Sequence, residues 1–266
     1  STATTPATNT PMPPTTATTI ATTTPAPPTT PPPASATRPA APTNTVGPRA
    51  TPCALSFTDV HAPDYFYTPV LYLACHGVIS GYANGDGTYS FRPYNQTTRA
   101  QQVKIVVLGF ARPIMTPAGG NSTFADVPPS QPFFAVVETA AADQIVSGYT
   151  CGGPNEPCDS AHRPYFRPYA NVTRGQLAKI TVATAGWALR MPPSPTFADV
   201  APGSPFYAFV ETAACRGVVS GYACGGPGEI CDAQNRPYFR LGNPATRGQI
   251  AKIVYNALQS TQPCSP

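Results

Sequence analysis

The region after residue 52 is one sequence unit written three times, and this repetition constrains the fold more than any other feature. Each copy opens with Phe-x-Asp-Val, at residues 57–60, 124–127 and 197–200. A Ser-Gly-Tyr glycine follows 24 residues after each opening Phe, and these glycines are Gly81, Gly148 and Gly221. Repeats of this kind stack on their neighbours to bury a shared core, so we expect three equivalent structural units.

Each copy is predicted to be a helix, a loop and a second helix. In the first copy a helix over about residues 64–75 would place Phe66, Val70 and Leu73 or Ala74 on one apolar stripe and end near Gly77. The second helix has a start signal, because Thr98 is followed three residues later by Gln101, the pattern of a capping box. The same Thr and Gln pair recurs in the other two copies.

These motifs resemble the S-layer homology domain family, whose repeats carry Phe-x-Asp-Val, Ile-Ser-Gly-Tyr, Phe-x-Pro and Thr-Arg-Ala-Glu elements. The resemblance covers nearly all of residues 57–258. It implies a mainly α fold, in which three helix-loop-helix repeats form a pseudo-threefold, trimer-like domain with the second helices near its axis. We place the repeats at residues 53–112, 120–187 and 193–264. It also implies export to a bacterial surface and noncovalent binding of cell-wall polysaccharide in grooves between repeats.

The resemblance also implies a set of glycan-binding residues. Its functional arginine matches the first residue of each predicted second helix, where backbone N–H groups and the helix dipole favour anions. The predicted set is Arg99, Arg174, Arg247, Asp59, Asp126, Asp199, Gly81, Gly148 and Gly221. The alternative is that each arginine pairs with the Asp of an adjacent repeat and only holds the repeats together. The sequence alone weights both interpretations equally.

Two departures from the family weaken the glycan prediction and leave the fold prediction intact. The usual Glu of the helix start is replaced by Gln101, Gln176 and Gln249. The usual Trp early in the first helix is replaced by Phe66, Phe134 or Tyr207. These rings could still stack on a sugar, although such residues more often lie in the core.

The eight cysteines predict four disulfides and an oxidising, extracellular compartment. The second and third copies each contain an eight-residue expansion bounded by cysteines, which predicts Cys151–Cys158 and Cys224–Cys231 bridges rather than a zinc site. Of the three pairings open to the other four cysteines, we favour Cys53–Cys75 and Cys215–Cys264. The first copy has Asn-Gly and Asp-Gly steps at residues 84–87 instead, which favour a tight turn over a calcium loop.

Residues 1–50 form a low-complexity arm that contains 17 Thr, 13 Pro and 10 Ala. Such a composition cannot bury a core and favours an extended, polyproline-II-like conformation. It is also typical of O-glycosylated stalks, and a bare spacer is the alternative. The predicted O-glycosylation sites are Thr22, Thr23, Thr24, Thr29 and Thr30. Triplets of the N-glycosylation type begin at Asn95, Asn121 and Asn171, and most of them are expected to be empty.

Several function classes are disfavoured by the residue inventory. The chain is predicted not to be an enzyme, and to need no cofactor or metal, because its three histidines occupy no repeated position and no nucleophile motif is present. A net charge of +4 spread over scattered Lys and Arg gives no nucleic-acid footprint. The longest apolar run, residues 105–111, is too short to span a membrane. Because the chain starts at Ser1, a secretion signal is expected to have been removed or left out.

Two functional hypotheses follow. The preferred one is a structural, glycosylated subunit of an extracellular fibre or surface layer, because apart from the repeats the sequence offers only the arm, which would pack on neighbouring subunits. The alternative is a wall-anchoring module that binds acidic cell-wall polysaccharide at the three Thr-Arg-Ala/Gly-Gln sites. The predicted partners are therefore other copies of the chain, cell-wall polysaccharide, or both, together with covalently attached glycans.

Overall fold

Each copy of the sequence unit forms a short helix followed by a longer one in the computed structural model, which describes residues 53 and 55–264. The arm and its predicted glycosylation sites lie outside these residues. The short helices are α1 (Tyr67–Cys75), α3 (Phe134–Ala142) and α5 (Tyr207–Cys215). The long helices are α2 (Arg99–Gly109), α4 (Arg174–Ala185) and α6 (Arg247–Gln259). The remaining elements of the described part are a hairpin of β1 (Tyr82–Ala83) with β2 (Tyr89–Ser90), and a 3-10 turn, η1 (Ala118–Gly120).

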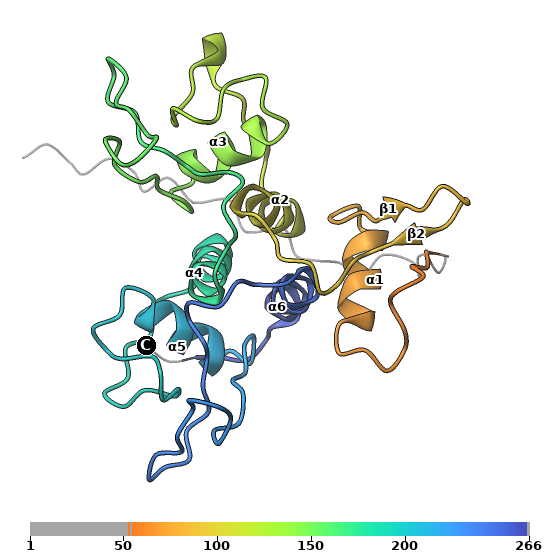
Figure 1. Cartoon of the computed structure of the whole chain (residues 1–266), viewed down its shortest axis with the longest axis vertical. Helices are drawn as coiled ribbons and strands as arrows, with labels where there is room; N and C mark the ends of the chain where they lie inside the picture. Colours follow the sequence, from red (N-terminus) through yellow and green to blue (C-terminus); the bar gives the residue numbers. More distant parts are fainter. Residues whose placement is uncertain (1–52, 54, 265–266) are drawn as a thin grey trace, which may run out of the picture. The chain divides into compact units, whose positions relative to one another are not determined.

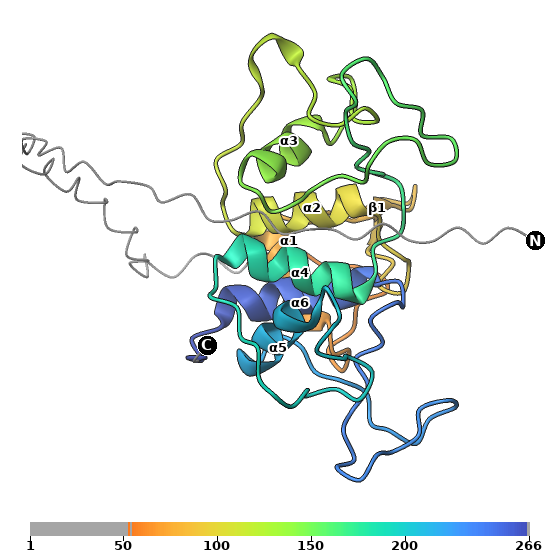
Figure 2. The same ribbon diagram turned by 90° about the vertical axis from the view of Figure 1, so that its left-hand side faces the viewer.

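The three long helices contact one another in pairs and are surrounded by the short ones (Figure 1). Figure 2 shows α2, α4 and α6 from the side, lying next to one another. Each short helix packs on a long helix from a different copy: α3 on α2, α5 on α4, and α1 on α6. The last of these contacts joins the first copy to the third, so the three units interlock in a closed arrangement.

A ring of backbone hydrogen bonds joins the three copies just before the long helices begin. The N–H of Thr97 donates to the carbonyl of Ala245 at 3.0 Å, Ala245 donates to Val172 at 2.8 Å, and Val172 donates to Thr97 at 2.9 Å. Because each bond links a different pair of copies, the ring fixes the register of all three at once.

The predicted capping boxes are present at all three long helices. In α2, Thr98 Oγ1 accepts from the Gln101 N–H, while Gln101 Oε1 accepts from the Thr98 N–H at 3.1 Å. The second and third copies form the same pair of bonds. The first short helix begins later than predicted, at Tyr67, because Asp64 lies in a preceding turn where its carboxylate accepts from the His61 N–H at 2.7 Å.

The core is built from the residues that define the repeat. The opening Phe of each copy packs on the Phe that precedes the second helix, with ring centroids 5.2–5.7 Å apart, and these pairs are Phe57–Phe91, Phe124–Phe166 and Phe197–Phe239. The predicted apolar stripe of α1 is buried as well, with Val70 and Leu73 fully inaccessible. Packing in the core therefore explains most residues of the repeat pattern.

All eight cysteines form disulfides in the pairing favoured from the sequence: Cys53–Cys75, Cys151–Cys158, Cys215–Cys264 and Cys224–Cys231. Two of these bridges close the inserted loops, and the other two join α1 and α5 to segments outside the helices. Among the helices of the described part, none is long and apolar enough to cross a membrane.

Candidate functional site

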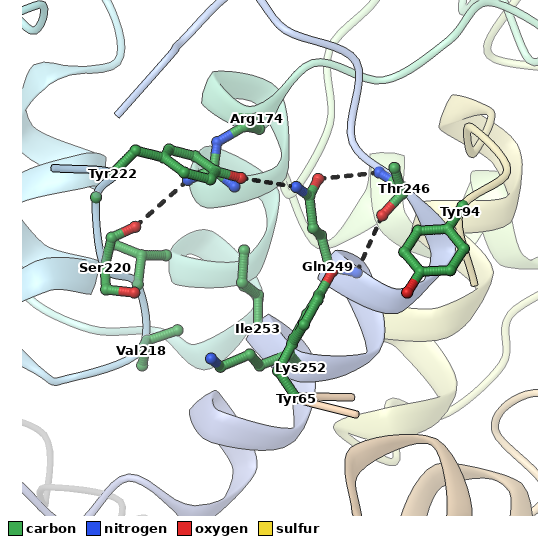
Figure 3. A pocket seen from close by; sticks show the side chains of 12 residues that line it. Tyr65, Tyr94, Arg174, Val218, Ser220, Tyr222, Thr246, Gln249, Lys252 and Ile253 are labelled. Carbon is green, nitrogen blue, oxygen red and sulfur yellow. Dashed lines mark hydrogen bonds between the residues drawn. The ribbon is translucent and has the colours of Figure 1, made fainter. Parts of the chain in front are cut away.

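Three pockets of similar construction lie between the copies, and we name each after its arginine. In each pocket an arginine from one copy faces the Ser-Gly-Tyr loop and the second helix of the following copy. The Arg174 pocket has a volume of about 360 Å³, the Arg247 pocket about 270 Å³ and the Arg99 pocket about 170 Å³. Figure 3 shows the Arg174 pocket, with Tyr222 and Ser220 on one side, Tyr94 on the other, and Gln249 and Lys252 between them.

The three arginines are buried and tie one copy to the next. Only 5–9% of each residue is exposed: Arg99, Arg174 and Arg247. The Nε of Arg174 donates to the Phe239 carbonyl at 2.7 Å, and the other two make the matching bonds at 2.8–2.9 Å. Burial lowers the pKa of all three guanidinium groups, although an arginine retains its charge in proteins. Each pocket therefore has a fixed positive charge in its wall.

The aspartates of the opening motif support the arginines indirectly, through the loop between them. Both carboxylate oxygens of Asp59 accept backbone N–H bonds, from Phe91 and Arg92 at 2.7 Å. Asp126 and Asp199 make the same two bonds in their own copies. Within the described residues, none of the ion pairs joins one of these aspartates to a pocket arginine. The alternative interpretation, a direct Arg–Asp pair, is therefore wrong in its partner, because each Asp instead holds the loop whose Phe carbonyl accepts from the arginine. The arginines do join neighbouring copies, as that alternative expected.

The helix N-termini are closed to an anion, contrary to the sequence-based expectation. The N–H of Arg174 donates to the Asn243 carbonyl at 3.0 Å, and that of Gly175 donates to Leu241 at 3.0 Å. Equivalent bonds close the starts of α2 and α6, and the threonine cap accepts the third N–H in every case. An anion can therefore reach the guanidinium edge but not the first backbone donors of the helix.

The predicted glycines line the pockets, and packing explains why all three positions are glycine. A Cβ on Gly81 would lie 2.5 Å from a Phe57 ring carbon. One on Gly148 or Gly221 would lie 2.5 or 2.7 Å from the Cβ of a following proline. Of the nine predicted site residues, the structure thus brings the arginines and glycines to the pockets, while the aspartates do not line them.

Sequence reasoning missed the lysines as pocket residues. The chain contains three lysines, and each lines a different pocket: Lys104, Lys179 and Lys252. None of them takes part in an ion pair within the described part of the chain. The sequence contains a signal for these lysines, because each one lies five residues after one of the three pocket arginines.

In the second and third copies the aromatic wall was predicted one residue out of register. Phe134 and Tyr207 are buried in the core, whereas the preceding Phe133 and Phe206 line the Arg247 and Arg99 pockets. The sequence is ambiguous here because both positions are aromatic in every copy. The Arg174 pocket has Tyr65 and Tyr94 in this wall.

The Ser-Gly-Tyr tyrosines connect these parts. In the Arg174 pocket the Gln249 amide donates to the Tyr222 hydroxyl at 2.9 Å, and the guanidinium of Arg174 lies 5.1 Å from the Tyr222 ring centroid. The Arg99 pocket repeats this arrangement with Gln176 and Tyr149. Each pocket thus combines two cations with amide and hydroxyl groups beside an aromatic wall.

Helical repeats that share similar pockets at their junctions define a modular repeat protein. The family model described as the S-layer homology domain matches residues 56–101 and 123–178. The third copy lies outside the match. No curated protein matches the chain. S-layer homology domains are surface-anchoring, non-catalytic modules, so the two matches indicate a bacterial surface or cell-wall-anchoring protein.

Proposed function

We propose that the three repeats anchor this protein to the bacterial cell wall by binding an acidic wall polysaccharide in the pockets between the copies. The observation that carries the proposal is the distribution of charge. Each pocket contains one buried arginine and one of the three lysines, and the residues that line the three pockets include no Asp or Glu. Two cations without a carboxylate partner favour an anionic ligand over a neutral or cationic one.

The other lining groups suit a sugar. A polysaccharide offers hydroxyl groups as donors and acceptors, and the pockets supply glutamine amides, serine and tyrosine hydroxyls to meet them. Aromatic rings in the wall can pack against the C–H face of a pyranose. Three pockets on one chain would also bind a polymer with avidity well above that of a single pocket.

The fibre hypothesis assigns the contacts between subunits to residues 1–50, which lie outside the described residues. It therefore stays a prediction, and so does O-glycosylation of the arm.

The lysines provide a better test than the arginines, because the buried arginines hold the copies together and their removal would damage the fold. The experiment compares cosedimentation of the full chain with wall sacculi that retain their anionic polysaccharide. Replacing Lys104, Lys179 and Lys252 by Ala should weaken binding at least tenfold, because a charge-assisted bond is worth about 1.5–3 kcal/mol. Replacing all three by Arg should preserve most of it.

A charge-matched control replaces Arg112, Arg190 and Arg216 by Gln, since these arginines line none of the three pockets. This variant loses the same formal charge and should sediment like the unmodified chain. Equal sedimentation of the triple Lys→Ala variant and the unmodified chain would contradict the proposal.

A further inference from the structure

The end of the repeat domain at which the three long helices begin is an exposed, uncharged surface. Three equivalent segments form it, one from each copy, and each directly precedes the backbone ring described above. All nine of their residues are exposed, none carries a charge, and only Tyr94 among them lines one of the three pockets. We call this surface the axial face: residues 94–96, 169–171 and 242–244.

The axial face is held in place by bonds between the copies. The carbonyls of Asn95, Ala170 and Asn243 accept from the first N–H of α6, α2 and α4, at 2.9–3.0 Å. The side chain of Asn171 donates to that of Gln96, which joins the second segment to the first. A surface fixed in this way loses little conformational entropy when a partner binds.

Two tyrosines of the axial face are exposed, Tyr94 by 71% and Tyr169 by 69%. The Tyr94 ring is braced edge-on by the buried ring of Phe66, with centroids 5.7 Å apart. The Tyr169 hydroxyl accepts from the Gln131 side chain at 3.5 Å. Fixed aromatic rings of this kind bind extended proline-rich segments, because they pack on proline rings. The amides of the axial face can donate to the carbonyls of such a segment.

The chain itself contains a ligand of this class. Its first 50 residues include 13 Pro and 17 Thr, and residues 1–37 carry no charged side chain. Such a segment favours polyproline II and offers carbonyl acceptors in excess, because each proline lacks an N–H. Neither it nor the axial face would have to desolvate a charged side chain on contact.

The chain enters the repeat domain at the end opposite the axial face. Helix α1 runs alongside α6 in the same direction: Phe66, directly before α1, contacts Tyr94, whereas Tyr72, late in α1, lies 5.1 Å from Tyr255, late in α6. The last residue of α1 is bonded to Cys53. An arm that leaves at one end and binds at the other would join copies head to tail, and such contacts build an open filament unless they close into a ring.

We infer that the axial face binds the proline-rich arm of a second copy of this chain. Prolines of the arm pack on Tyr94 and Tyr169, and the surrounding amides donate to its carbonyls. An extended arm reaches on the order of 150 Å, whereas the 13 residues of α6 span about 20 Å, so the arm is long enough to reach a neighbouring copy. A stiff proline-rich segment also resists the reversal that binding to its own axial face would require. The inference goes beyond the proposed function and does not depend on it.

Photo-crosslinking of the full chain tests this inference. p-Benzoylphenylalanine replaces Tyr94 or Tyr169 in separate variants, and an equal mixture of ordinary and ¹⁵N-labelled chain is irradiated. After proteolysis, mass spectrometry should find cross-links to the first 50 residues. Pairs of one light and one heavy peptide should be as frequent as unmixed pairs, because the contact joins different copies. The same probe at Tyr89, a tyrosine of β2 that is 49% exposed and lies outside the axial face, should give no cross-link to the arm.

The isotope pattern decides between the occupants. Cross-links to the arm in unmixed pairs alone would show that the arm folds back on its own chain, and would overturn the assignment of a second copy. Cross-links from the axial face that leave out the arm would overturn the site.

Self-association gives a second measurement. In sedimentation velocity the average mass of the full chain should rise with concentration beyond that of a dimer, because head-to-tail contacts leave both ends open. Tyr94→Ala combined with Tyr169→Ala should raise the concentration of half-association at least tenfold, while Tyr89→Ala should leave it unchanged. An excess of a synthetic peptide of residues 22–33 should dissociate the assemblies, and the same peptide with Ala in place of each Pro should not. A double tyrosine variant that associates like the unmodified chain would contradict the inference.

Discussion

The tyrosine of the Ser-Gly-Tyr loop is supported in one way in the first copy and in another way in the two later copies. In the first copy the segment after Ser-Gly-Tyr is a short hairpin, β1 with β2, whose turn is closed by Asp86 accepting from the Thr88 N–H at 2.9 Å. In the second and third copies it is a longer loop closed by a disulfide. This segment is thus held by local hydrogen bonds in the first copy, and by covalent and ionic bonds in the other two.

The ion pairs of the two inserted loops lie beside pocket tyrosines. In the third copy Glu229 of the inserted loop forms a bidentate pair with Arg240 at 2.6 and 2.9 Å, and this guanidinium lies 3.9 Å from the Tyr222 ring centroid. The second copy has the same arrangement with Glu156 and Arg167. The equivalent arginine of the first copy, Arg92, lies over Tyr82, and its guanidinium forms none of the ion pairs found among the described residues. The insertions therefore orient one pocket tyrosine each and neutralise the arginine beside it.

Opening a loop disulfide should destabilise the folded chain most. Replacing Cys224 and Cys231 by Ser should lower the free energy of unfolding by about 2–3 kcal/mol, because the unfolded chain regains the entropy of an eight-residue loop. Asp86→Ala, which removes the turn bonds of the first copy, should cost less. Urea unfolding followed by Trp187 fluorescence and by circular dichroism measures both. A greater loss from Asp86→Ala than from the double cysteine variant would show that the disulfide is not the stronger support.

A smaller effect should appear in the pH dependence of stability. The Arg240 side chain holds the pKa of Glu229 below its ordinary value, so the pair stabilises the folded state above the ordinary glutamate pKa. That contribution is lost as the pH falls through the lowered pKa of the folded state. Arg167 acts in the same way on Glu156.

Unfolding free energies of the unmodified chain and of Glu229→Gln, measured from neutral to acid pH, test this prediction. The gap between the two proteins should be constant near neutrality and close in acid. A gap that widens on acidification would contradict the assigned sign.

Substitutions of the cap glutamines should change the stability least. Gln249 caps its helix and also donates to Tyr222, whereas Gln101 makes only the cap bond within the described residues. Gln249→Leu should therefore destabilise the chain by about 1 kcal/mol more than Gln101→Leu, the net worth of one hydrogen bond. Thermal unfolding of the two variants gives this difference, and equal losses would show that the tyrosine bond contributes nothing.

Much of the fold could be predicted from local sequence signals. The capping boxes, the apolar stripe of α1 and the left-handed Gly77 that follows it, at φ +69°, depend on residues close together in the chain. The start of α1 was predicted three residues early because Asp64 competes for the backbone through its own side chain.

The site was less predictable because its bonds join different copies. The partner of Arg247 is the Phe91 carbonyl, 156 residues away, and a carbonyl leaves no mark in the residue type. The closed helix N-termini have the same cause, since their acceptors are backbone atoms of the next copy. The lysines differ from these bonds, because their fixed offset from the arginines is visible in the sequence. Only the structure shows that all three lysines line pockets.

Amine labelling measures directly whether the lysine-bearing pockets are the surface by which this chain binds the wall. The full chain is acetylated for short times with and without wall sacculi, and the extent of modification at Lys104, Lys179 and Lys252 is read by peptide mass spectrometry, with the N-terminal amine as reference. We expect bound sacculi to protect the three lysines relative to the N-terminal amine. Equal labelling rates at all three lysines with and without bound sacculi would contradict it.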